Sequence, residues 1–194
     1  MIADNQNTDD RRYKRGFTLL ETLIVFSLLS VLMGVSAYLF TVSLRVWVTG
    51  SLRTEIRENM SYAMEKTVRD LKAMALGSLS QYDSGSGNIA HTIQYDDLSG
   101  NTYVLYLYNA DDLSFDSDYS QSLYNLRKAN ITQGDNPASG EGVLILQDLV
   151  SPAAAEPATD LTIDPNATLV TLDFVVQRGD ETVTIRTKVR PRNL

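Results

Sequence analysis

The sequence of 194 residues contains no cysteine and a single histidine, His91. The absence of cysteine excludes disulfides, thiolate metal sites and cysteine nucleophiles, and it leaves the redox compartment undetermined. Proline is also scarce. The five prolines all lie at or after Pro137, so no proline interrupts a helix in the first half of the chain.

Positive charge is in deficit: there are 17 Lys and Arg against 24 Asp and Glu, which gives a net charge of -7. This balance opposes broad binding to phosphate backbones, so nucleic acid is not expected as a partner. The sequence also shows no recognisable catalytic motif. The turn at 84–87 (SGSG) lacks the strand-to-helix context of a serine nucleophile, and no phosphate-binding glycine loop is present. We therefore predict a non-enzymatic protein without a cofactor.

The polarity of the chain inverts near Gly16. Arg11, Arg12, Lys14 and Arg15 precede this glycine, and from Phe17 to Leu44 the only charged side chain is Glu21. The uncharged stretch 22–44 would be roughly 35 Å long as a helix, enough to cross a hydrocarbon core of about 30 Å. The cluster of positive charges before it predicts a single membrane span with a cytoplasmic N-terminus.

A helical hydrophobic period continues beyond the apolar stretch. Apolar residues recur at spacings of three and four, at Val48, Leu52, Ile56, Met60, Met64, Val68 and Leu71. Charged residues occupy the other faces and form two i,i+4 pairs, Glu65 with Arg69 and Lys66 with Asp70. The pattern predicts one helix over about 17–76 whose second half is amphipathic and packs on a globular head.

After Gly77 the chain alternates between turn clusters and short runs with strand character. Strands are expected at 89–95, 102–108, 122–130, 143–150, 168–177 and 181–190, whereas 151–164 (SPAAAEPATDLTID) is expected to be a loop. In the last two strands apolar and polar residues alternate, which predicts an antiparallel sheet with one buried face. The predicted fold class is therefore α+β: a long N-terminal helix packed on an antiparallel β-sheet head.

Glu21 is the most informative residue of the apolar segment. A carboxylate inside a membrane-spanning helix is expensive unless it is paired. Cleavage between Gly16 and Phe17 would create an α-amino group at the helix start. The amine of the same chain or that of a neighbouring, axially staggered helix could then pair with Glu21.

The stretch 15–21 (RGFTLLE), followed by the long apolar run, resembles the prepilin signal of type IV pilins and pseudopilins. The resemblance implies that a membrane prepilin peptidase cuts after Gly16 and N-methylates Phe17, and that Glu21 is the assembly glutamate of the mature chain. It also implies a long N-terminal helix with a β-rich head, as the residue patterns predict.

Three short stretches resemble the J-type minor pseudopilin of type II secretion and the W-type minor pilins: 68–71 (VRDL), 123–127 (LYNLR) and 189–193 (VRPRN). Major pilins usually carry an early helix-kinking proline and a cysteine-closed C-terminal region, and this chain has neither. The K-type minor subunit lacks the glutamate, so Glu21 argues against that type. A minor pilin or pseudopilin of a type IV pilus or type II secretion filament is the expected function.

The expected organisation is a cleaved cytoplasmic leader (1–16), a transmembrane and filament-core helix (17–44), an amphipathic helix (45–76) and a β-rich periplasmic head (77–194). The resemblance implies inner-membrane lipid, prepilin peptidase and other pilins or pseudopilins as partners. The protein would first sit in the bacterial inner membrane with its head outside, and later in a periplasmic or extracellular filament.

Two other interpretations of the N-terminus remain. An ordinary signal peptide could have its apolar region at 23–33 and a small-residue cleavage site at 35–37, before Tyr38. An uncleaved single-span anchor is the second alternative. In either case the head would be a membrane-anchored or secreted β-rich binding module.

The acidic residues Asp111, Asp112, Asp116 and Asp118 raise the question of calcium. An EF-hand loop starting at Asp112 would have Ser117 at its glycine position and Leu123 at its final glutamate position, so that template fails. We predict a solvated acidic loop and no metal, with a calcium site outside the EF-hand pattern as the alternative. His91 is expected to lie in a strand.

Overall fold

The computed structural model describes residues 18–75, 77–83, 89–111, 115, 118–164 and 169–191. The helix α1 spans Leu19–Lys72. The strands are β1 (Ile93–Asp96), β2 (Thr102–Asn109), β3 (Leu123–Asn130), β4 (Val143–Val150), β5 (Asp160–Asp164), β6 (Leu169–Arg178) and β7 (Glu181–Val189). The predicted α+β class is confirmed. The chain divides into two compact units after Val48.

The helix α1 ends at Lys72, four residues before the predicted boundary. The cause is a competing backbone interaction. Met74 forms an antiparallel bridge with Asp97, and the Ala75 amide donates to the Asp96 carbonyl at 2.8 Å. The chain therefore leaves the helix in order to pair along the outer edge of β1.

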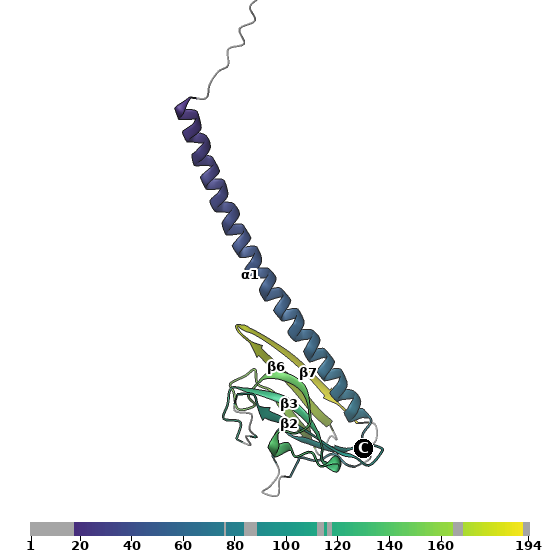
Figure 1. Cartoon of the computed structure of the whole chain (residues 1–194). Helices are drawn as coiled ribbons and strands as arrows, with labels where there is room; N and C mark the ends of the chain where they lie inside the picture. The colour runs from purple at the N-terminus through teal and green to yellow at the C-terminus, as the bar shows by residue number, and fades with distance from the viewer. Residues whose placement is uncertain are drawn as a thin grey trace, which may run out of the picture. The chain divides into compact units, whose positions relative to one another are not determined.

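The second half of α1 packs on the sheet through the face that the sequence pattern predicts. Ile56, Met60, Met64 and Leu71 are buried, and Leu52 and Val68 pack against the same core. Ala63 and Thr67 are buried as well, because they lie between these residues on the same face. Val48 was expected to face the core, but 55% of its surface is exposed. Figure 1 shows β6 and β7 running alongside this half of the helix.

All seven strands that the structure describes belong to one antiparallel sheet, in the order β1-β2-β3-β4-β6-β5, and β7 pairs with the other edge of β6. Six of the strands were expected, but the segment that forms β5 was predicted to be a loop. Its sequence, DLTID, does alternate, with Leu161 buried and Thr162 exposed. The Pro and Ala residues that precede DLTID are typical of a loop, and five residues are too few for the alternation to outweigh them.

His91 lies in a turn and not in a strand, because its φ of 53° belongs to the left-handed region. The predicted strand over 89–95 therefore begins only at Ile93. The Nδ1 atom of His91 lies 3.1 Å from the Asp160 carboxylate. This contact joins the turn before β1 to the start of β5.

The prediction of one buried face is correct for β7 and wrong for β6. In β7 the residues Val183 and Val189 are buried while Thr184 and Lys188 are exposed. In β6 every residue from Leu172 to Val176 is buried. In the sheet β6 is a central strand, with β7 on one edge and β4 and β5 on the other, whereas β7 pairs on one edge within the described residues.

A small second core covers the other face of β2 and β3. It consists of Val104, Tyr106, Tyr108 and Ala129. The Tyr106 hydroxyl donates to the Glu141 carbonyl, and burial raises the pKa of Tyr106 to about 12. This core explains why β2 is buried on both faces.

A charged contact fixes the end of α1 on β3. The Lys128 ammonium lies 2.5 Å from the Asp70 carboxylate and 4.1 Å from the centre of the Tyr103 ring. Burial, together with the nearby Asp70 carboxylate, raises the pKa of Tyr95 well above its ordinary value. Asp70 thus binds Lys128, although the sequence pattern had paired it with Lys66. The other expected pair, Glu65 with Arg69, is present at 2.9 Å.

Replacing the fully buried Met60 by alanine should lower the free energy of unfolding by about 2–5 kcal/mol, because it removes apolar contacts and leaves a cavity. Urea unfolding of the full chain in detergent measures the change. The control is Leu98→Ala, at a turn residue that is 74% exposed, which should alter stability by less than about 0.5 kcal/mol. Equal losses in the two variants would contradict the packing of Met60 in the core.

Candidate functional site

The candidate site is the start of α1, where the sequence places cleavage and assembly. Gly16 and Phe17 lie outside the described residues, which begin at Thr18. The Glu21 amide donates a hydrogen bond to the Thr18 hydroxyl oxygen at 3.3 Å. A threonine followed three residues later by glutamate is the spacing of a helix capping box, so Thr18 caps the helix. The sequence analysis missed this role, although the T-x-x-E spacing could have revealed it.

The side chain of Glu21 is exposed in the first turn of α1. No Lys, Arg or His of the described residues forms an ion pair with it. The helix dipole favours an anion at this end, because unsatisfied backbone N–H groups gather there. The carboxylate therefore sits where the local backbone stabilises it and where a second molecule can reach it.

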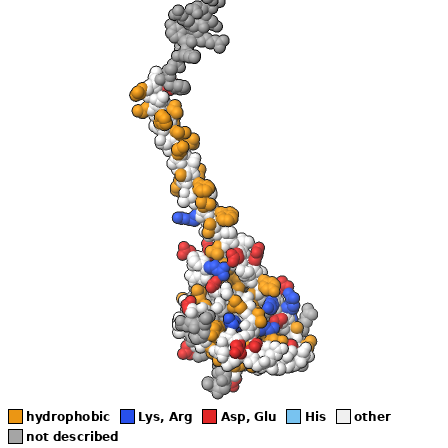
Figure 2. Space-filling view, viewed as in Figure 1, with side chains coloured by type: hydrophobic (Ala, Val, Ile, Leu, Met, Phe, Trp, Pro, Cys, Tyr) orange, Lys and Arg blue, Asp and Glu red, His pale blue; other side chains and the backbone are white. Residues whose placement is uncertain are grey.

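The first half of α1 is a continuous apolar surface. Among the described residues, α1 is the one helix that is long and apolar enough to cross a membrane, and none of its most apolar window is buried. Figure 2 shows hydrophobic side chains along this half and charged side chains over the unit that begins at Thr49. Large apolar residues such as Leu28, Leu32 and Phe40 are 64–66% exposed.

Several hydroxyl side chains of the apolar half donate hydrogen bonds within the helix. Ser27 donates to the Ile24 carbonyl at 2.8 Å, and Thr41 donates to the Ala37 carbonyl at 2.7 Å. A hydroxyl bonded to its own helix can enter hydrocarbon without leaving an unpaired donor. These residues are therefore compatible with a lipid environment.

Small residues form one stripe along this half of the helix. They follow one another at spacings of three and four: Ser27, Ser30, Gly34, Ala37 and Thr41. Space around Gly34 is open, since a Cβ atom added there would meet nothing within 4 Å. In membranes such stripes allow helix backbones to approach one another closely. The stripe is thus a suitable surface for a neighbouring helix.

The alternative cleavage site, before Tyr38, falls within α1. The helix is uninterrupted from Leu19 to Lys72, and Thr41 on the far side of this position bonds back to Ala37. A cut at this point would divide a regular helix and remove about a third of its 54 residues. The structure thus gives no sign of a domain boundary at Tyr38.

The calcium candidates are only partly described. Asp112 and Asp116 lie outside the described residues, whereas Asp111 and Asp118 lie within them. The Asp111 amide donates to the Asn109 side-chain oxygen at 2.8 Å. Within the described ranges, no three His, Asp or Glu side chains gather in a way that could hold a metal ion.

One comparison with known proteins bears on this segment. Residues 11–37 match the prokaryotic N-terminal methylation motif. No curated protein and no solved structure is significantly similar to the chain. The motif and the apolar helix together fit a membrane-anchored protein of the pilin type that is processed as a prepilin.

Replacing Thr18 by alanine should destabilise the first turn of α1 by about 1 kcal/mol, which would speed amide exchange there about fivefold. Hydrogen exchange on the full chain in detergent measures this. Thr41→Ala is the matched control, since it removes a hydroxyl that bonds to a carbonyl in mid-helix. If both variants left the first turn unchanged, Thr18 would not be its cap.

Proposed function

We propose that this protein is a minor pilin or pseudopilin, a structural subunit of a type IV pilus or type II secretion filament. One observation carries the proposal: the methylation motif over 11–37 ends in an apolar helix whose first turn presents an exposed Glu21, which pairs with no cation of the described residues. Prepilin peptidase cuts after Gly16 and methylates the amine of Phe17. The segment 17–44 then serves as membrane anchor and filament core, 45–76 as the amphipathic helix and 77–194 as the head.

The charge distribution supports the direction of insertion. Four basic residues lie at 11–15, whereas Arg45 alone follows the apolar stretch closely. This asymmetry retains the leader 1–16 in the cytoplasm and places the head on the other side of the inner membrane. The peptidase then meets its cleavage site at the cytoplasmic surface, and lipid surrounds the apolar half of α1.

The proposed assembly step uses Glu21, because no cation of the described residues pairs with its carboxylate. A carboxylate in an apolar medium is costly until a positive charge neutralises it. In our proposal the methylated amine of Phe17 on a neighbouring subunit provides that charge. A charge pair in low dielectric penalises any other axial alignment of the two helices, so the pair sets the stagger between subunits.

The small-residue stripe supplies the packing surface for this step. Leaving lipid for a filament core exchanges one apolar environment for another, so hydrophobic burial alone gives little drive. Close backbone contact at Ser30, Gly34 and Ala37 adds van der Waals attraction that the bulkier faces cannot provide. Helix contacts and the Glu21 charge pair would thus act together.

The assignment as a minor subunit rests on sequence features. No proline kinks α1 and no cysteine closes the C-terminal region. Of the stretches similar to J-type pseudopilins and W-type minor pilins, 68–71 lies at the end of α1 and 123–127 lies in β3. The third, 189–193, begins at the last residue of β7 and extends beyond the described residues. We propose a non-enzymatic role in which other pilins or pseudopilins of the same filament are the partners.

The processing step predicts the mass of the mature protein. Isolated from its native membrane, the chain should begin with methylated Phe17, and it should retain residues 1–16 when the prepilin peptidase is deleted. Intact mass and N-terminal sequencing measure this directly. A chain that begins at Tyr38 would identify an ordinary signal peptide, and an unprocessed start in both strains would identify a simple anchor.

The pairing step predicts the effect of Glu21→Gln. The variant should insert and be cleaved normally, but filament incorporation should fall about tenfold or more, since losing about 1.4 kcal/mol already corresponds to that factor. Quantitative blotting of sheared filaments measures incorporation. Glu65→Gln, at an exposed glutamate of the same helix that binds Arg69, is the control and should incorporate normally. Normal incorporation of the Glu21 variant would refute the pairing mechanism.

A further inference from the structure

We propose that the first half of β4, from Val143 to Gln147, is a docking edge. There an extended segment of a different subunit of the same filament adds as a further β-strand. It places one apolar side chain in a groove between β4 and α1. The inference rests on the proposed function, because it takes the partner from the same filament.

The pairing of β4 leaves this edge open. On one side β4 pairs with β3 along most of its length, from Val143↔Lys128 to Val150↔Leu123. On the other side its pairing within the described residues is limited to one position, Leu149↔Val176 of β6. The backbone N–H and C=O groups that point away from β3 before this position therefore have no strand partner. A row of such groups is a template for another strand.

The open edge results from a kink at Asp148. The backbone of this residue has a φ of 60°, and the register between β3 and β4 shifts on either side of Leu126. Arg178 at the end of β6 binds the Asp148 carboxylate at 2.8 and 2.9 Å and that of Glu55 at 3.1 Å. These contacts raise the pKa of Arg178. They join the end of β6 to α1 through Glu55 and to β4 at the kink through Asp148, while β4 before the kink has no pairing with β6. Strand irregularities of this kind commonly end pairing and redirect a strand.

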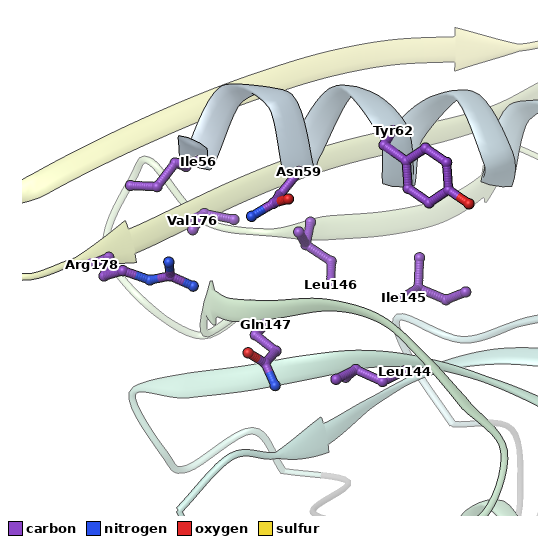
Figure 3. A pocket seen from close by; sticks show the side chains of 9 residues that line it. All are labelled: Ile56, Asn59, Tyr62, Leu144, Ile145, Leu146, Gln147, Val176 and Arg178. Atoms are coloured by element: carbon purple, nitrogen blue, oxygen red, sulfur yellow. The ribbon is translucent and has the colours of Figure 1, made fainter. Parts of the chain in front are cut away.

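A groove of about 220 Å³ lies where the two strands separate. Figure 3 shows Ile56, Asn59 and Tyr62 of α1 on one side of it and Leu144–Gln147 of β4 on the other. Cavities of about 150 Å³ can hold benzene, so this groove has room for one large aliphatic or aromatic side chain.

The groove has a buried apolar floor of Ile56, Leu146 and Val176, and Asn59, Gln147 and Arg178 add polar groups to its lining. Exposed apolar side chains lie at its rim and along the adjoining edge of β4. Tyr62 is 68%, Val143 60% and Leu144 40% exposed. Exposed apolar residues grouped along a strand edge mark an interaction surface more strongly than scattered ones do.

The outer edge of the sheet at β7 has the opposite character. Its exposed side chains are Thr182, Thr184, Arg186 and Lys188, and Arg186 binds the buried Asp173 at 2.7 Å. Charged residues on an edge strand discourage the addition of another strand. The residues Val143–Leu146 of β4 carry no charge, so the head protects one edge and leaves the other available.

Two observations favour a different subunit over a second copy of this chain. From Thr49 to its end the chain has 20 acidic and 12 basic residues, so two heads repel each other. A twofold pairing of β4 with itself would also be antiparallel, and it would point the two α1 helices in opposite directions. Subunits anchored in one membrane have parallel helices, which a different subunit with its own strand can satisfy.

Hydrogen exchange tests strand addition directly. We compare the full chain in detergent with the same chain in isolated filaments. The amides of 143–147 should exchange about tenfold or more slowly in filaments, because a new strand would bond them. Leu144→Lys and Val143→Lys should each abolish this protection and reduce incorporation. Leu98→Lys, at an exposed leucine in the turn between β1 and β2, should behave as wild type.

The outcomes separate the docking edge from the proposed function. If wild type enters filaments but exchange at 143–147 is unchanged, the docking edge is refuted and the function stands. Protection that appears in detergent and rises with protein concentration would identify a second copy as the occupant and overturn the proposal. If wild type is neither cleaved after Gly16 nor incorporated, the proposed function fails, and the docking edge fails with it.

Discussion

The structure depends on one constraint: a single helix must satisfy two environments in succession. Around its first half α1 is apolar on every side, whereas from Leu52 onward its aliphatic and methionine side chains lie on one face and Tyr62 is the exposed aromatic residue. Lipid or parallel helices can cover the apolar first half of α1 from all sides. The single apolar face of the second half packs instead against one face of the sheet. The change falls near Val48 and Thr49, where the chain also divides into its two units.

The sheet meets this constraint by curling around the amphipathic face. The central strand β6 contributes Leu172, Phe174 and Val176 to the core that receives Ile56, Met60 and Met64. Two charged contacts, Asp70 with Lys128 and Glu55 with Arg178, then hold the helix at both ends of the interface. Apolar area supplies most of the stability, whereas the ion pairs define the register of helix and sheet.

The sequence predicted those parts of the structure that depend on local period. The long helix and six of the strands follow from patterns within one segment. The turn at His91 and the partner of Asp70 depend on contacts between residues far apart in the chain, whereas β5 pairs with the next strand along the chain and was missed because Pro and Ala residues precede its short alternation. Lys128, for example, lies 58 residues beyond Asp70, and no local pattern joins them. The kink at Asp148 was equally hidden, because it occurs within an ordinary run of strand residues.

The first turn of α1 carries a helix cap that sequence reasoning missed beside the glutamate that it singled out. The Thr18 hydroxyl accepts the Glu21 amide and so satisfies one of the free backbone N–H groups at the helix start. The helix dipole favours the Glu21 carboxylate at this end, and no cation of the described residues binds it. In the proposed filament this carboxylate would meet the amine of a neighbouring subunit, so the cap and the assembly contact would use different side chains of one turn.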